Sequence, residues 1–165
     1  NSCLTWAAVA PDSSRMTVRF PQPSADRRRS NHYSIRRTGV SHNPGFLKVV
    51  EAARGRVCEC TVADVKARLD RTERFHFVDV REDDEYAQDH AAGAIHLGKG
   101  VIERDIETVL PDKHDSIVLY CGGGYRSVLA ADSIRLMGYT NVISMDGGIK
   151  AWRAAGYPIE KGRRP

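Results

Sequence analysis

The residues best suited to chemistry in this chain lie in the stretch CGGGYR, at positions 121–126. Cys121 ends an apolar run that is typical of a buried strand, and three glycines follow it directly. Because glycine tolerates positive φ angles, such a loop can curl tightly and direct successive backbone N–H groups inward as an anion-binding nest. A thiol at the centre of this nest would be stabilised as the thiolate, which is the nucleophilic form of cysteine.

The residues that follow the loop predict a helix whose N-terminus faces this thiol. Its buried residues are expected to be Ala130, Ala131, Ile134 and Met137, and Gly138 is expected to end it. The free N–H groups and the positive dipole end of a helix N-terminus stabilise negative charge. The terminal sulfur of a cysteine persulfide is also negative, so the same surroundings would stabilise it. The stretch therefore suits a cysteine that accepts a sulfur atom, holds it and passes it on.

The elements that must position this loop alternate between strands and helices. Strands are expected at 56–60, 75–80, 93–97, 116–121 and 141–145. The segments between them have helical spacing. A last helix follows Gly147 and Gly148, and its Trp152 is expected to pack in the domain core. This alternation predicts an α/β fold with a small, mainly parallel β-sheet and helices on both faces. Ligands of such folds bind at the carboxyl ends of strands, where Cys121 is expected to lie.

Two helices near the start of the domain have clear local signals. The first has four apolar residues at helical spacing, expected to form its buried face: Phe46, Val49, Val50 and Ala53. The second is predicted to begin with Thr61 as N-cap and Asp64 completing a capping box. An acidic run at 82–85 suits the first turn of a third helix, because negative charge complements the helix dipole there.

The positive net charge of the chain comes from its N-terminal segment. Residues 1–45 contain seven arginines and only two acids, are rich in proline and serine, and have no sustained apolar periodicity. We expect a basic, disordered tail there and the folded domain at 46–165. The domain carries nearly equal numbers of basic and acidic residues, so nucleic acid is not an expected partner. No apolar run approaches the ~18–20 residues of a membrane span, so no membrane is expected either.

The four cysteines (Cys3, Cys58, Cys60 and Cys121) follow neither a disulfide framework nor a paired zinc spacing. We therefore expect a reducing compartment, the cytoplasm, with no metal and no organic cofactor. An organellar address in the arginine- and serine-rich tail is the alternative. For Cys58 and Cys60, on a short strand, we expect one exposed and one buried thiol rather than a redox pair.

The sequence YCGGGYRSVLAA resembles the active-site loop of the rhodanese-like sulfurtransferases. Three further segments resemble the same family in the same order: VDVRE (78–82), EYAQDHAAGAIHL (85–97) and GGIKAWRAAGYPI (147–159). The resemblance covers about residues 57–160. It implies that sulfane sulfur moves through a Cys121 persulfide from a small donor, such as thiosulfate or a persulfide, to a thiophilic acceptor. That acceptor would be cyanide or a thiol, including a protein thiol.

The resemblance also implies roles for individual residues. Cys121 would be catalytic, and the anion cradle would comprise Gly122, Gly123, Gly124, Tyr125 and Arg126. Arg126 would close the loop, with Glu82 or Glu85 as its partner. Asp79 and Arg81 would be the supporting Asp-x-Arg pair, with Arg81 either structural or facing substrate. His90 and His96 are expected to belong to the scaffold.

The chain departs from the family pattern in two places. The usual Gly-His-Ile-Pro-Gly-Ala is replaced by Asp-His-Ala-Ala-Gly-Ala at 89–94, which removes a rigid proline. The loop interior also lacks the basic residues that thiosulfate-using members often carry, so a preference for a dianionic donor is not implied.

Two other classes of function remain open. Cysteine phosphatases and arsenate reductases also place a thiolate in an anion cradle, but they hold five residues between cysteine and arginine. Here four residues separate Cys121 from Arg126, and the smaller cradle favours a sulfur atom over a tetrahedral oxyanion. The second class is a rhodanese-like module used only for binding. Such modules usually lose the cysteine, which this chain keeps.

Overall fold

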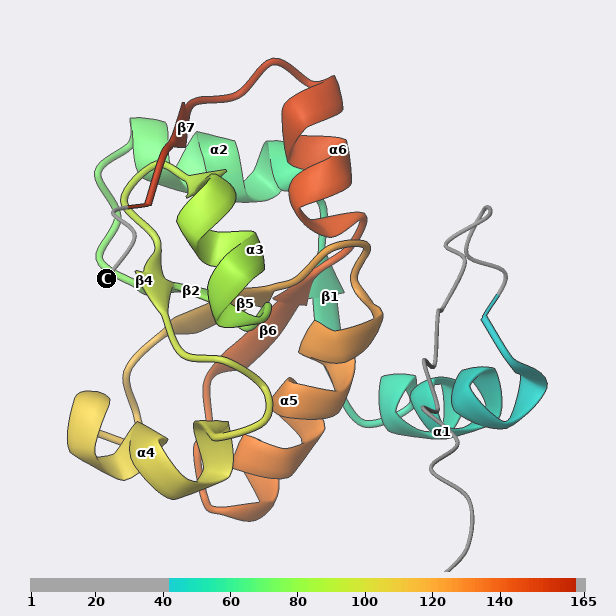
Figure 1. The fold of residues 1–165 in the computed structure, drawn as a ribbon. Helices are drawn as coiled ribbons and strands as arrows, with labels where there is room; N and C mark the ends of the chain where they lie inside the picture. The colour runs from blue at the N-terminus through green and yellow to red at the C-terminus, as the bar shows by residue number, and fades with distance from the viewer. Residues whose placement is uncertain (1–41, 163–165) are drawn as a thin grey trace, which may run out of the picture. The chain divides into compact units, whose positions relative to one another are not determined.

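The computed structural model describes residues 42–162, so the tail expected at 1–45 lies almost wholly outside the described residues. The helices are α1 (Pro44–Arg54), α2 (Val62–Asp70), α3 (Asp83–Gln88), α4 (Ile102–Val109), α5 (Tyr125–Leu136) and α6 (Gly148–Ala154). The strands are β1 (Cys58–Cys60), β2 (His76–Asp79), β3 (His90–Ala91), β4 (Ile95–His96), β5 (Ile117–Tyr120), β6 (Val142–Met145) and β7 (Ile159–Glu160). Figure 1 shows these elements as a ribbon.

The main sheet has five parallel strands in the order β1-β6-β5-β2-β4. Leu119 of β5 lies between Val78 of β2 and Ser144 of β6, so β5 is the central strand. All four residues of β5 are buried, as expected for a strand covered on both faces. The predicted α/β fold, with a mainly parallel sheet and helices on both faces, is confirmed.

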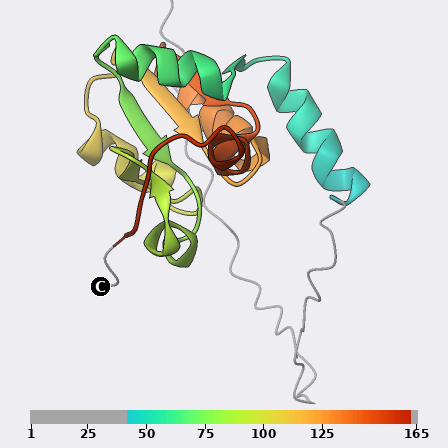
Figure 2. The ribbon, with the colours of Figure 1, turned by 90° about the horizontal axis from the view of Figure 1, so that it is seen from above.

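The alternation of side chains along β5 divides the core into two layers. Ile117 and Leu119 pack with residues of α1, α4 and α5, whereas Val118 and Tyr120 pack with residues of α2 and α6. Figure 1 shows α4 and α5 on one side of the sheet and α2 and α6 on the other, and Figure 2 shows the same ribbon from above. Trp152 of α6 is 1% exposed and belongs to the second layer, as predicted.

The local signals at the helix starts are present in the structure. The Thr61 hydroxyl accepts a hydrogen bond from the Asp64 N–H (3.1 Å), and the Asp64 carboxylate accepts one from the Thr61 N–H (2.9 Å). This is the predicted capping box. At α3, the Glu85 carboxylate accepts a hydrogen bond from the Glu82 N–H (3.3 Å), so the acidic run does form a first helical turn.

Two features differ from the sequence-based expectations. Val49 was expected on the buried face of α1 but is 57% exposed, whereas Val50 and Ala53 are buried. Neighbouring helical residues point about 100° apart, so the buried stripe centres on Val50 and leaves Val49 outside it. The structure also pairs β3 with β7 in a two-stranded antiparallel sheet that was not predicted, because two-residue strands have no readable period.

Met137 is a smaller correction of the same kind. It follows the last residue of α5 as its C-cap and is only partly buried, while Gly138 takes a positive φ and ends the helix as predicted. None of the helices at 42–162 is long and apolar enough to cross a membrane.

Candidate active site

Cys121 lies directly after the central strand β5, at the carboxyl end of the sheet, and is 1% exposed. Its carbonyl oxygen accepts a hydrogen bond from the Ile149 N–H at 2.8 Å, in the first turn of α6. Gly148 makes this approach possible: a Cβ added there would lie 2.2 Å from the Cys121 carbonyl oxygen. The backbone of the thiol residue is therefore held between β5 and the start of α6.

The backbone N–H groups of the loop are available to bind an anion. Within residues 42–162, the N–H groups of residues 122–127 donate to no backbone or side-chain acceptor. They comprise the loop after Cys121 and the first turn of α5, where an intrahelical partner is missing by geometry. An anion nest requires a run of unpaired donors of this kind, and the anion cradle at residues 122–126 stays a prediction.

Only one of the three loop glycines needs a glycine-specific conformation. Gly124 has φ +93°, and a Cβ there would lie 3.1 Å from an Asp146 carboxylate oxygen. Gly122 and Gly123 have no positive φ, and a Cβ on Gly123 would meet only the Tyr125 ring, at 3.9 Å. The turn thus depends on Gly124, whereas the sequence alone suggested that all three glycines shared this role.

Two buried serines lie beneath the thiol. The Ser127 hydroxyl is 3.7 Å from Cys121 Sγ and 3.0 Å from the Gly124 carbonyl oxygen, and it can donate to either. The Ser144 hydroxyl, from β6, donates to Ser127 Oγ at 2.9 Å. Both serines are fully buried. The sequence analysis missed them, although a serine after the loop arginine and a lone polar residue in an apolar strand were readable signals.

Arg126 is held by acidic residues at the start of α3. Its guanidinium donates to both carboxylate oxygens of Glu85 (2.7 and 3.0 Å) and lies 3.4 Å from the Glu82 carboxylate. Both predicted partners are therefore present. The hydrogen bond and charge of Glu85 raise the pKa of Arg126. Burial opposes ionisation of Glu85, but the Arg126 hydrogen bond and charge prevail and lower the pKa of that carboxyl.

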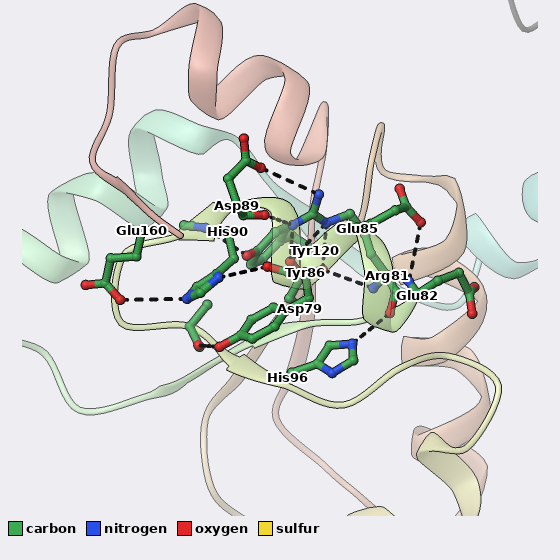
Figure 3. Close-up of polar contacts among 12 residues, drawn as sticks. Asp79, Arg81, Glu82, Glu85, Tyr86, Asp89, His90, His96, Tyr120 and Glu160 are labelled. Atoms are coloured by element: carbon green, nitrogen blue, oxygen red, sulfur yellow. Dashed lines mark hydrogen bonds and ion pairs between the residues drawn. The ribbon is translucent and has the colours of Figure 1, made fainter. Parts of the chain in front are cut away.

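Asp79 and Arg81 form a buried ion pair away from solvent. The Arg81 guanidinium donates to the Asp79 carboxylate, with a shortest distance of 2.6 Å, and to the Asp89 carbonyl oxygen at 2.6 Å. Arg81 is 3% exposed and Asp79 is fully buried (Figure 3). Burial opposes the charge on Arg81, but the Asp79 hydrogen bond raises the pKa of Arg81. This geometry favours the structural role for Arg81 over contact with substrate.

The two histidines that were assigned to the scaffold pack on opposite sides of Tyr86. The centroid of the Tyr86 ring lies 3.8 Å from that of the His90 ring and 4.5 Å from that of the His96 ring, and both pairs are stacked. His96 Nε2 is 2.9 Å from the Arg81 carbonyl oxygen, and His90 Nδ1 is 3.1 Å from the Tyr86 carbonyl oxygen. Figure 3 shows this cluster beside the Asp79–Arg81 pair. These contacts support the scaffold assignment.

Cys58 and Cys60 are free thiols with different surroundings. Cys58 is exposed and Cys60 is partly buried, so the two thiols do differ in exposure. Alternation along the strand is not the reason, because residues two apart in a strand point to the same face. Burial and the nearby Asp64 charge raise the pKa of Cys60 to about 11. A thiol that resists ionisation is a poor redox partner. Within the described residues no cluster of histidines, cysteines and carboxylates could hold a metal ion.

A wide hollow lies away from Cys121. It has a volume of about 1050 Å³, lies between α3 and β7, and is lined by acidic residues that include Asp83, Asp89 and Glu160. The loop at 121–126 is instead a small, donor-lined site on a strand end. Its chemistry, and not the size of a cavity, identifies it as the candidate active site.

The sequence model of the rhodanese-like domain family matches residues 61–155, more than half of the chain. The chain therefore belongs to the rhodanese-like domain family, as the resemblance of its motifs predicted. Among its relatives, the thiosulfate sulfurtransferase PspE of Escherichia coli is 39% identical over 75 residues, which cover 46% of this chain and 71% of PspE.

Two solved structures have a similar fold. A thiosulfate sulfurtransferase from Pseudomonas aeruginosa matches with a TM-score of 0.64 and 26% identity, covering 72% of this chain and 22% of that one. A protein of unknown function from Rhodopseudomonas palustris, described as a possible tyrosine phosphatase, matches with a TM-score of 0.65 and 27% identity. That match covers 74% of this chain and 98% of the other.

Proposed function

We propose that this protein transfers sulfane sulfur through a persulfide on Cys121. The observation that carries the proposal is a buried thiol at a strand end, followed in the chain by the unpaired N–H groups of residues 122–127 and contacted by the Ser127 hydroxyl. Preorganised donors of this kind stabilise negative charge on sulfur at no reorganisation cost. Relatives named as thiosulfate sulfurtransferases support the same activity.

The reaction has two displacements at sulfur. The Cys121 thiolate attacks the sulfane sulfur of the donor, a new S–S bond forms, and the donor's own bond to that sulfur breaks. With thiosulfate, sulfite leaves with the electron pair. An acceptor thiolate or cyanide then attacks the outer sulfur, takes it as a persulfide or as thiocyanate, and restores the Cys121 thiolate. Each half-reaction conserves charge and needs no cofactor.

The loop favours no particular donor by charge. The positive charge of Arg126 is already balanced by Glu85 and Glu82, so the guanidinium shapes the loop more than it attracts a dianion. Small persulfides and thiosulfate are therefore both donors in this proposal, and cyanide and thiols, including a protein thiol, are acceptors. A reducing compartment such as the cytoplasm belongs to the proposal, because Cys121 must be a free thiol to accept sulfur.

The experiment is mass spectrometry of the protein after incubation with thiosulfate or with a small persulfide. Wild-type protein should gain one sulfur on the peptide that contains Cys121, and cyanide should remove it as thiocyanate. The Cys121→Ser variant should gain none at that peptide and lose turnover. Cys58→Ser, which removes an exposed thiol elsewhere, should behave as wild type.

The other two functions predict different outcomes. A phosphatase or arsenate reductase would hydrolyse an aryl phosphate or reduce arsenate through Cys121 and show no sulfur gain. A binding module would show neither reaction with any donor. Turnover of donor and acceptor by Cys121→Ser would contradict the persulfide mechanism itself.

A further inference from the structure

The first helix contacts the candidate active-site loop through Tyr125. The His42 ring, just before α1, lies 4.4 Å from the Tyr125 ring between centroids, and the Phe46 ring lies 6.1 Å from it. His42 and Phe46 also pack on each other, at 5.1 Å. Tyr125 is the first residue of α5 and one of the loop residues whose N–H groups are unpaired. Three aromatic rings therefore form one cluster that joins α1 to the loop.

Arg54, at the end of α1, contacts the same part of the loop. Its guanidinium carbon lies 5.4 Å from the centre of the Tyr125 ring, a distance at which a cation is attracted by the ring face. Arg54 also pairs with Glu59, at 3.2 Å, and lies 3.9 Å from an Asp146 carboxylate oxygen. An Asp146 carboxylate oxygen lies 3.1 Å from the position that a Cβ would take on Gly124, the glycine with positive φ. Arg54 thus contacts the loop directly at Tyr125 and indirectly through Asp146.

The Tyr125 ring can transmit these contacts to the loop backbone. Two ring carbons lie 3.9 and 4.0 Å from the position that a Cβ would take on Gly123. The Tyr125 ring is therefore placed over the glycine backbone, and its other contacts are with His42 and with Phe46 and Arg54 of α1. Bulky neighbours on one side of a bare glycine segment restrict how far that segment can relax.

These contacts come from outside the region that defines the family. The family match begins at residue 61, whereas α1 ends at Arg54. Val50 and Ala53 of α1 nevertheless lie in the same core layer as Val128 and Ala131 of α5. In this chain α1 is thus part of the domain core and touches the loop directly.

We propose that α1 is a positioning element of the active site. His42, Phe46 and Arg54 hold the Tyr125 ring against the loop, and this keeps the N–H groups of residues 122–127 in the arrangement that binds an anionic donor. The inference rests on the proposed sulfur transfer and identifies residues that act on it through Tyr125.

The test compares Phe46→Ala and Arg54→Gln with Val49→Ala. Val49 lies on the same helix and is largely exposed, so it serves as the matched control. The rate of persulfide formation on Cys121 is measured against thiosulfate concentration, at a temperature where thermal unfolding shows every variant to be folded. We expect the donor concentration for half-maximal rate to rise about three- to tenfold in both variants, the scale of lost aromatic and cation–π contacts. Val49→Ala should match wild type, and Phe46→Tyr should largely restore wild-type behaviour.

A role of α1 in stability alone would lower the unfolding temperature without moving this half-saturation. That result would overturn the inference. So would an equal thiosulfate concentration for half-maximal rate in Arg54→Gln and Val49→Ala. If Phe46→Ala does not fold, Arg54→Gln still decides, because Arg54 is partly exposed.

A second readout does not depend on sulfur transfer. The backbone amide NMR signals of Gly122, Gly123 and Gly124 should shift in Phe46→Ala and Arg54→Gln but not in Val49→Ala. If wild-type protein never gains sulfur, the proposed function fails, while shifted amides would still show that α1 positions the loop. Unshifted amides together with wild-type kinetics would refute the positioning role alone.

Discussion

The Ser127 hydroxyl lies 3.7 Å from Cys121 Sγ and 3.0 Å from the Gly124 carbonyl oxygen, and it receives a hydrogen bond from Ser144. A hydroxyl has one proton, so Ser127 can donate to only one of these acceptors at a time. A negative sulfur is the stronger acceptor, because hydrogen bonds to charged groups are the stronger ones. In the proposed sulfur transfer, Ser127 is thus placed to follow the charge on Cys121.

Replacing Ser127 with alanine should slow sulfur acceptance. The change removes a donor to the thiolate, so we expect the rate of persulfide formation near neutral pH to fall about tenfold. The measurement is the rate of persulfide formation on Cys121, with Ser133→Ala on the same helix as control. A rate equal to that of wild type would show that Ser127 has no contact with the reacting charge.

Gly148→Ala should destabilise the protein more than the same replacement at another glycine with positive φ. The new methyl group would meet the Cys121 carbonyl oxygen, and the position also has φ +52°. Gly156 is a matched control, since it has φ +68° but nothing within 4 Å of a Cβ. We expect Gly156→Ala to lower the free energy of unfolding by about 1 kcal/mol through backbone strain. Gly148→Ala should cost about 3 kcal/mol or more, because overpacking adds to it.

Denaturant unfolding with a parallel assay of sulfur gain at Cys121 measures both effects. Equal losses of stability in the two variants would mean that the Gly148 backbone is free to move away from Cys121.

Glu85 should make stability depend on pH on the acidic side. Burial raises the folded-state pKa of Glu85, but the hydrogen bond and charge of Arg126 outweigh burial, so the pKa is lowered. A lowered pKa contributes stability above the unfolded-state value of about 4.3, and this contribution disappears as pH falls through the folded-state pKa. Glu85→Gln should therefore lose about 1 kcal/mol at neutral pH and show a shallower loss of stability below about pH 4.3.

The check is the free energy of unfolding as a function of pH for wild type, Glu85→Gln and Glu103→Gln. Glu103 is exposed on α4 and serves as the control. If all three proteins lose stability in parallel below pH 5, the Arg126–Glu85 pair does not stabilise the fold.

Cys58 and Cys60 should react at very different rates with an alkylating agent. The pKa of Cys60 is raised to about 11 by burial and by the Asp64 charge, and its side chain is partly covered. At pH 8 only about one Cys60 in a thousand would then be ionised. Peptide mapping after brief iodoacetamide treatment should find Cys58 modified well before Cys60. Equal labelling, or an internal disulfide under mild oxidation, would revive the redox-pair alternative.

The sequence predicted those parts of the fold and site that depend on local pattern. The apolar run before Cys121 predicted β5, Thr61 and Asp64 predicted the start of α2, and the acidic run at the start of α3 supplied the partners of Arg126. Each of these needs only neighbouring residues or a charge match at one sheet edge. The family motifs then added the Asp79–Arg81 pair, which the structure shows as a buried ion pair.

The rest depends on which distant segments become neighbours. Gly148 contacts the Cys121 backbone, and Ser144 reaches Ser127, only because β6 pairs with β5. The apolar periodicity of a single strand does not predict which other strands it pairs with. The contacts of α1 with Tyr125 likewise depend on packing between α1 and α5, which the apolar stripe of α1 allows but does not specify.

The pairing of β1 with β6 has a consequence for biosynthesis. The first strand of the sheet finds its neighbour only in the last one, so a ribosome must release almost the whole domain before β1 can join. Cys121, in contrast, is translated before β6 and before the Ile149 N–H that fixes its carbonyl oxygen. A nascent chain thus presents this thiol before its surroundings are assembled. Under the proposed function, Cys121 could hold sulfur only in the last stage of translation, when β6 and α6 have left the ribosome.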